Sequence, residues 1–277
     1  MTATADANDD TAPRERRGHV LLGAELAAIY LGLPVLIATD VVPLHVLLAL
    51  WLVGGICLLA LLRDPGFDRH RLGGAVRPWV RPILLRFAVL APVLALVTWT
   101  AAPELLLAFP RREPAWWTVV MLLYPPLSVV PQGVVYRVFF SHRYRPLLPS
   151  PRARVIGSAA VFAFTHVVFG NWVAPALTGA GGLLFASTYE RSGSALAAAA
   201  EHALWGCFVI TFGLGVFVFG RFRLGNAGSG GGRRVLITHH DGASDGYLVE
   251  RWCLSPAASA VRCRGCGWAI SSSPRLW

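Results

Sequence analysis

Long hydrophobic runs, separated by short polar segments, follow one another along most of the chain. A helix that crosses a bilayer needs about 20 mainly apolar residues. The runs that approach this length cover residues 20–39, 44–62, 83–102, 116–140, 155–169, 172–189 and 195–219. The pattern therefore predicts an all-α protein, a multi-pass transmembrane helical bundle with about seven spanning helices.

Polar segments flank these runs at both ends of the chain. Residues 1–18 are polar and mixed in charge, which is unlike the start of a cleaved signal peptide, so we expect the first run to remain as a helix. Residues 224–277 open with a glycine-rich stretch and show no helical periodicity, as is typical of a flexible tail. Their Cys263 and Cys266 form only half a zinc motif, and we interpret them as incidental. We therefore expect the bundle to occupy residues 19–223.

Composition supports a membrane protein. Hydrophobic residues make up 55% of the 277 residues and charged residues only 14%, whereas soluble domains carry about 25% charged residues. The formal charge of +10 could indicate nucleic-acid binding. The arginines, however, lie mostly at the ends of hydrophobic runs, so we expect the lipid bilayer and no nucleic acid as a partner.

The basic segments predict an orientation. The N-terminal tail and the loops at 63–81 and 142–154 carry most of the arginines between the predicted helices. Seven helices threaded alternately place all three segments on one side of the membrane. Cytoplasmic loops carry an excess of arginine and lysine, so we expect that side to be the cytoplasm and the membrane to be a bacterial inner membrane.

Polar residues inside the last four runs are the candidate functional residues. Ionisable groups are costly within a membrane span and are often functional there. The strongest candidates are Gln132, Arg137, His166, Glu201 and His202.

Arg137 needs a partner from another helix. Residues four apart share a helix face, and Gly133 offers no side chain to Arg137. We expect Glu201 to be the counter-ion, with Glu190 as the second choice. Glu201 could alternatively act as a catalytic base, but hardly in both roles.

The two histidines allow more than one chemistry. Neutral imidazole suits zinc, which makes His166 and His202 candidate metal ligands and Zn²⁺ the candidate cofactor. Imidazole can equally act as an acid or base, or donate a hydrogen bond to an oxyanion. The plainer alternative is that both histidines only hydrogen-bond across helices. Because a glutamate, an arginine and a glutamine share the neighbouring helices, we favour a functional site.

The order and spacing of these residues resemble the CPBP family of intramembrane proteases, which includes the CAAX prenyl endopeptidases and bacteriocin-processing or immunity proteins. The family's Glu-Glu-x-x-x-Arg corresponds to residues 132–137, its Phe-x-x-x-His to 162–166, and its His-x-x-x-Asn to 202–206. The resemblance covers about 116–219. It implies that His166 positions an attacking water, that His202 stabilises the oxyanion, and that Arg137 is structural.

This chain departs from the family pattern at three positions. Gln132 and Gly133 replace the two glutamates, and Gly206 replaces the asparagine. An amide cannot act as a general base near neutral pH. Loss of a general base costs about 10²–10⁴-fold in rate, and loss of one oxyanion donor about 10²–10³-fold.

Two functions follow from the resemblance, and a third is disfavoured. The first is an endopeptidase with impaired activity on membrane-embedded or lipidated proteins. The second is an inactive member that binds a membrane partner, for example in bacteriocin immunity. A small transporter is disfavoured because transporters usually show internal repeats, which are not evident here.

Overall fold

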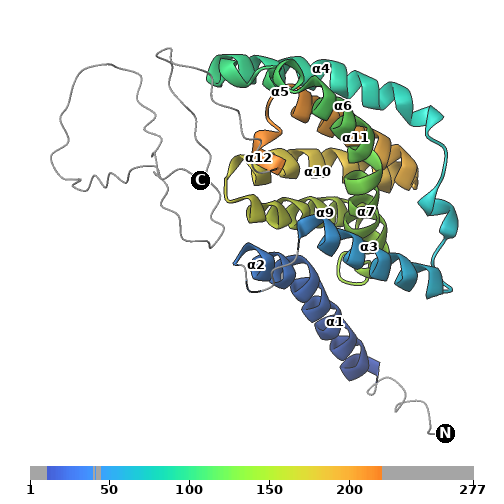
Figure 1. Cartoon of the computed structure of the whole chain (residues 1–277). Coiled ribbons are helices and arrows are strands. Elements are labelled where there is room, and N and C mark those ends of the chain that lie inside the picture. Colours follow the sequence, from blue (N-terminus) through green and yellow to red (C-terminus); the bar gives the residue numbers. More distant parts are fainter. Residues whose placement is uncertain (1–10, 40, 42–44, 220–277) are drawn as a thin grey trace, which may run out of the picture. The chain divides into compact units, whose positions relative to one another are not determined.

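The computed structural model describes residues 11–39, 41 and 45–219 (Figure 1). Every regular element among them is a helix, which confirms the all-α class. The expectations for the tail at 224–277, including its cysteine pair, lie outside the described residues.

Five helical segments of the described chain are long and apolar enough to cross a membrane, so the protein is multi-pass. The first combines α1 (Thr11–Ala27), the π-helical η1 (Ala28–Gly32) and α2 (Leu33–Ala38). The second is α3 (Val46–Arg63) and the third α4 (Arg77–Ala101). The fourth comprises α6 (Pro114–Tyr124), η4 (Pro125–Val129), α7 (Val130–Gly133), η5 (Val134–Phe139) and α8 (Phe140–Arg143). The fifth joins α9 (Pro151–Thr165) to the 3-10 turn η6 (His166–Phe169).

The last two predicted spans are not among these five. They correspond to α10 (Val173–Ser192) and α11 (Ala195–Thr211), which is followed by the short α12 (Val216–Phe219). The predicted end of the seventh helix at residue 219 is wrong, because α11 stops at Thr211. The chain turns at Gly213, whose φ of +94° favours glycine. A Cβ at Gly213 would also overlap the carbonyl of Leu105, next to the short helices η3 (Pro103–Leu105) and α5 (Ala108–Arg112).

The fourth span continues through its prolines by adopting π-helical turns. Pro131 has no N–H, so the carbonyl of Leu127 loses its normal helical hydrogen bond. The indole Nε1 of Trp51 on α3 donates to that carbonyl at 2.9 Å. A backbone carbonyl freed inside lipid must find such a partner, so α3 stabilises the broken segment.

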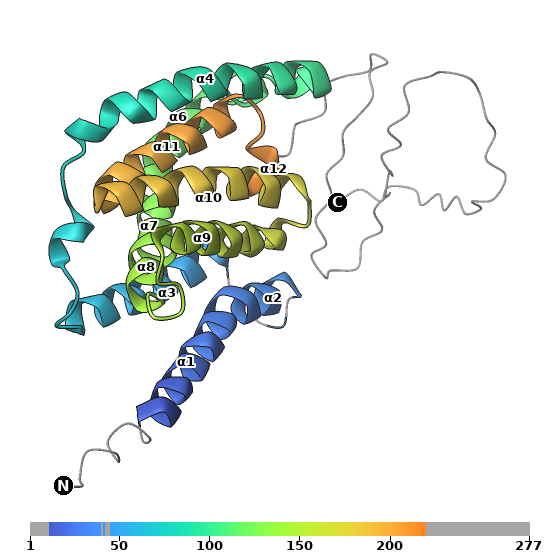
Figure 2. The same cartoon turned by 180° about the vertical axis from the view of Figure 1, so that it is seen from behind.

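Helices α9, α10 and α11 lie side by side, α4 packs on α11, and the fourth span crosses them (Figures 1 and 2). Two glycines on α10, Gly179 and Gly182, allow its close approach to α9. Their Cβ atoms would lie 3.4 Å from Ala163 Cβ and 3.0 Å from Ala159 Cα, respectively. A Cβ at Gly181 would instead meet the ring of Phe185, on its own helix.

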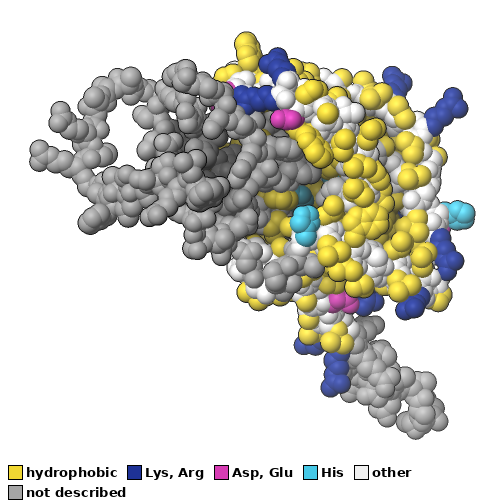
Figure 3. Space-filling view, viewed as in Figure 1, with side chains coloured by type: hydrophobic (Ala, Val, Ile, Leu, Met, Phe, Trp, Pro, Cys, Tyr) yellow, Lys and Arg dark blue, Asp and Glu magenta, His cyan; other side chains and the backbone are white. Residues whose placement is uncertain are grey.

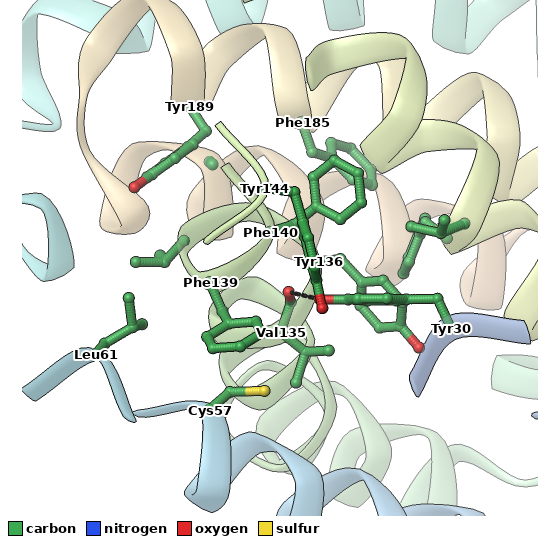
Figure 4. Packing of buried hydrophobic residues seen from close by; sticks show 14 of the residues in the cluster. Tyr30, Cys57, Leu61, Val135, Tyr136, Phe139, Phe140, Tyr144, Phe185 and Tyr189 are labelled. Carbon is green, nitrogen blue, oxygen red and sulfur yellow. Dashed lines mark hydrogen bonds between the residues drawn. The ribbon is translucent and has the colours of Figure 1, made fainter. Parts of the chain in front are cut away.

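An aromatic cluster joins the first span to the fourth (Figure 4). Tyr30 packs edge-to-face on Tyr136, Phe140 and Tyr144, and its hydroxyl donates to the carbonyl of Val135 at 2.8 Å. The outer surface is apolar. Figure 3 shows hydrophobic side chains over much of the described part of one face, with basic side chains at its margins. Such a surface is typical of a protein solvated by lipid.

The basic loops meet at one end of the bundle. His142 Nε2 donates to the carboxylate of Asp64 at 2.7 Å, which joins the end of the fourth span to the loop after the second. This bond, with a second from the backbone N–H of Gly66, holds the pKa of the Asp64 carboxyl below its usual value. Near this end Arg143 forms a bidentate pair with Glu25 of α1 at 2.6 and 3.0 Å.

Candidate functional site

A cavity of about 90 Å³ brings two of the predicted site residues together. Segments η1, α2 and α3 supply apolar walls. Besides Tyr30, whose hydroxyl donates to the carbonyl of Val135, the polar residues of the lining are Gln132, Tyr136, Thr165 and His166. The first two of these four lie in the fourth span and the last two at the junction of α9 and η6, so the cavity lies where the predicted first and second motifs meet.

His166 is held in one tautomer by its own helix. Its Nδ1 lies 2.7 Å from the carbonyl oxygen of Phe162, one turn earlier. A carbonyl only accepts hydrogen bonds, so the proton of the neutral ring is on Nδ1. Nε2 therefore carries the lone pair and is the ring atom that can accept a proton.

Gln132 presents an acceptor. Its Nε2 donates to Ser128 Oγ at 2.8 Å. Its Oε1 is buried and has no hydrogen-bond partner among the described residues. Buried polar atoms are rarely left unpaired, so Oε1 is suited to accept a hydrogen bond from a ligand or an attacking water.

His202 lies outside the cavity lining, behind an aromatic ring. Its imidazole stacks on Phe185 with centroids 4.5 Å apart, and its Nε2 is 3.3 Å from the hydroxyl of Tyr124. Phe162 separates the two histidines, with ring centroids 4.6 Å from His166 and 5.6 Å from His202. Both imidazoles therefore pack against the ring of Phe162.

Arg137 also packs against the Phe162 ring, and no carboxylate of the described residues forms an ion pair with it. It is 2% exposed, and its Cζ lies 4.1 Å from the centroid of Phe162 and 5.3 Å from that of Phe185. Its Nη1 donates to the carbonyl of Gln132 at 3.4 Å, whereas Nε and Nη2 have no hydrogen-bond partner within the described chain. Cation–π attraction is worth about 2 kcal/mol in a desolvated setting, so the rings take over part of the role of a counter-ion.

The expected pairing of Arg137 with Glu201 is wrong, because Glu201 pairs with Arg86 of α4. The Glu201 carboxylate is fully buried, with Oε1 3.1 Å from Arg86 Nη2 and Oε2 accepting from Thr188 Oγ1 at 2.5 Å. Arg86 Nη2 also donates to Thr188 Oγ1 at 2.8 Å, closing a three-membered network. The catalytic alternative for Glu201 stays a prediction.

The second choice, Glu190, is wrong as well. It forms a bidentate pair with Arg154 at 2.7 and 2.9 Å. Its place at the end of α10 puts it beside the start of α9 rather than beside Phe162.

Three contributors to the site were missed at the sequence level. Arg86 had a usable signal, because it is an ionisable residue inside the third hydrophobic run. Phe185 and Tyr124 had none, since aromatic residues are common in membrane helices.

The donor set does not match a catalytic zinc site. Such sites use three protein ligands and an open position. The described residues contain no group of three His, Cys, Asp or Glu side chains that could hold a metal ion. His166 and His202 remain the predicted ligands.

The comparison with protein families places all three motifs in one domain. Residues 113–208 match the family model described as Type II CAAX prenyl endopeptidase Rce1-like. The matched region holds Gln132, His166 and His202 and leaves out the first three spans. The chain matches none of the curated proteins and none of the solved structures with which it was compared.

Proposed function

Because residues 113–208 belong to the Rce1-like family of type II CAAX prenyl endopeptidases, we propose that this protein is an intramembrane endopeptidase with a weakened active site. Its substrates are membrane-embedded or lipidated proteins, cleaved at a peptide bond within reach of the bilayer. Family membership supports protein substrates in general; lipidation and impaired activity are our proposals.

One observation carries this proposal. Gln132 and His166 occupy the first and second motif positions and line the same cavity, although they are 34 residues apart in the sequence. Both present acceptors, through the amide Oε1 of Gln132 and the Nε2 of His166.

The proposed reaction uses His166 as the base. Gln132 Oε1 accepts one hydrogen bond from a water molecule and orients it, and His166 Nε2 takes the other proton as the water oxygen attacks the scissile carbonyl carbon. The tetrahedral intermediate collapses with loss of the amine, which takes the proton back from His166. The resemblance assigns to His202 the stabilisation of the charge that develops on the carbonyl oxygen, although His202 lies outside the lining of the cavity, and it assigns to Arg137 a structural role. Without a carboxylate at 132, we expect turnover about 10²–10⁴-fold lower than with one.

The absent carboxylates favour a second candidate function. With Gln132 and Gly133 in the glutamate positions, the protein could instead be a non-catalytic member that binds a membrane partner, as in bacteriocin immunity. In that case His166 and Arg137 preserve the scaffold alone.

We also propose a seven-span topology, in which α10 and α11 cross the membrane with the five longer segments. Contacts at the helix ends support it. Ser194, between α10 and α11, donates to the carbonyl of Gly73 at 2.6 Å, within the basic loop of 63–81. At the opposite end Asn171 donates to the carbonyl of Phe217 at 2.9 Å. We assign the basic end to the cytoplasm of a bacterial inner membrane, and the protease-like core to residues 116–219 of a bundle covering 19–223.

Peptide cleavage by the purified protein tests the proposed function. The substrate is a farnesylated peptide whose modified cysteine is followed by three residues, with a transmembrane peptide as the second substrate. We expect slow cleavage by the wild type, a further loss of about 10²-fold or more in His166→Ala, and no change in His70→Ala. His70 is the matched control because it is exposed and outside the cavity. Equal turnover in wild type and His166→Ala would contradict a catalytic role.

Restoring the carboxylates at 132 and 133 distinguishes the two candidate functions. In Gln132→Glu/Gly133→Glu the first side chain keeps its shape, and the second has room because a Cβ at Gly133 meets no atom within 4 Å. A weak enzyme should gain about 10²–10⁴-fold in turnover. If the wild type is inactive and the double variant active, the protein is a non-catalytic member on a protease scaffold.

A further inference from the structure

The side chain of Tyr124 fills the space beside Gly206. Gly206 lies on α11, one turn after His202. A Cβ built on Gly206 would overlap the Tyr124 hydroxyl and Cε1, and would lie 2.5 Å from Cζ. Any larger residue at 206 therefore requires the tyrosine to move, so the two positions share one volume.

Tyr124 reaches this volume from a different span. It is the last residue of α6, immediately before Pro125 and the π-helical turn η4. The phenol ring meets the His202 imidazole edge-to-face, with centroids 6.2 Å apart and planes at 86°. Its hydroxyl is 3.3 Å from His202 Nε2. A residue 78 positions away thus contacts the ring that starts the third motif.

Two contacts together define the orientation of His202. Phe185 stacks on one face of the imidazole at 4.5 Å, and the Tyr124 hydroxyl meets the ring at Nε2. Phenols stay uncharged near neutral pH, with an ordinary pKa of about 10. The hydroxyl can therefore donate a hydrogen bond to Nε2 or accept one from it. The uncharged amide of an asparagine at position 206 of α11 could do the same.

We infer that Tyr124 is a positioning residue for His202 and takes the place of a hydrogen-bonding side chain at 206, where the resembled motif has asparagine. That Tyr124 orients His202 and fills the space beside Gly206 does not require the protein to be an active enzyme. Only the expected effect on turnover rests on the proposed function.

Substitutions that remove the side chain at 124 and add one at 206 test whether the two positions share one volume. Gly206→Asn alone should lower thermal stability, because the new Cβ overlaps the tyrosine. Tyr124→Ala alone should lose about 10–100-fold in turnover, the range found when an outer partner of a catalytic side chain is removed. The double variant Tyr124→Ala/Gly206→Asn should recover most of both losses. A double variant no better than the worse single variant overturns the inference.

The tautomer of His202 provides a readout that does not need activity. In protein labelled with ¹⁵N-histidine, the His202 ring signals are assigned by their loss in His202→Gln. Tyr124→Phe retains the ring and removes only the hydroxyl, so it should shift the Nε2 resonance of His202 and leave that of His70 unchanged. An unchanged Nε2 signal overturns the inference. If the wild type cleaves no peptide but Tyr124→Phe shifts the Nε2 signal, the inference about Tyr124 holds and the proposed function fails.

Discussion

The buried pair between Arg86 and Glu201 leads to a prediction with a clear asymmetry. The Glu201 side chain is fully buried, whereas that of Arg86 is 28% exposed. Arg86→Met keeps a similar apolar stem and removes the charge, which leaves the Glu201 carboxylate with the hydroxyl of Thr188. Glu201→Gln removes the opposite charge and leaves a guanidinium that can still reach a polar surface. We expect Arg86→Met to be the more damaging change.

The size of the effect can be bounded. Breaking a buried ion pair by removing one partner costs about 3–5 kcal/mol. A carboxyl group with the ordinary pKa of about 4.3 can instead take up a proton at pH 7 for about 3.7 kcal/mol, which sets a ceiling. We therefore expect Arg86→Met to lower the free energy of unfolding by about 3–3.7 kcal/mol. Glu201→Gln should cost about 1.5–3 kcal/mol, the range for a lost hydrogen bond to a charged group.

Reversible unfolding in mixed micelles measures these free energies. The control is Arg81→Met, because Arg81 is an exposed arginine on the same helix; a surface change of this kind should stay within about 0.5 kcal/mol. The double variant Arg86→Met/Glu201→Gln completes a thermodynamic cycle and should show a coupling energy of about 1–3 kcal/mol. Equal losses in Arg86→Met and Arg81→Met, or strictly additive losses in the cycle, would refute this reasoning.

Three further changes probe packing, the broken span and the basic end. Gly182→Val should lower the free energy of unfolding by about 1–3 kcal/mol through overpacking against α9, whereas Gly55→Val, whose Cβ meets nothing within 4 Å, should be close to neutral in the same unfolding assay. Trp51→Phe should cost about 0.5–2 kcal/mol, since the carbonyl of Leu127 loses its donor inside the membrane; an unchanged stability would show that another group replaces the indole. The lowered pKa of Asp64 means that its stabilisation is present above the unfolded pKa of about 3.9 and is lost as the pH falls through the folded value. The stability difference between wild type and Asp64→Asn should therefore shrink below about pH 3.9 in a pH series of melting temperatures, and a constant difference would contradict the assignment.

Much of the fold was predictable, because lipid imposes a simple requirement on sequence. Five hydrophobic runs became five helices long enough to span, and the contact between Asp64 and His142 agrees with basic loops at a common end. The end of α11 was missed because residues 212–219 are as apolar as the helix before them. Gly213 was the local signal, since glycine often follows the last residue of a helix, and its close approach to the carbonyl of Leu105 is the tertiary contact at this turn.

The motif residues of the site were predictable, whereas Arg86, Phe185, Tyr124 and the pairing of the charges were missed. Burial of ionisable residues identified Arg137 and Glu201, and charge alone suggested that they meet. The structure instead gives Arg137 two aromatic rings and gives Glu201 the guanidinium of Arg86. Charge counting cannot detect a ring as a partner, because Phe162 and Phe185 resemble every other apolar position in the sequence.

The π-helical turns of the fourth span have a consequence for how its sequence should be aligned and edited. A π turn holds one residue more than an α turn, so η5 behaves like an ordinary helix that has absorbed an insertion. Removing a single residue from 134–136 would let the segment relax to α geometry while the side chains after it keep their faces, because the π turn holds the extra residue. The same deletion in an α-helical part of this span would instead swing every later side chain by about 100°. An alignment of this span should therefore allow a one-residue gap at 134–136 and none in its α-helical parts.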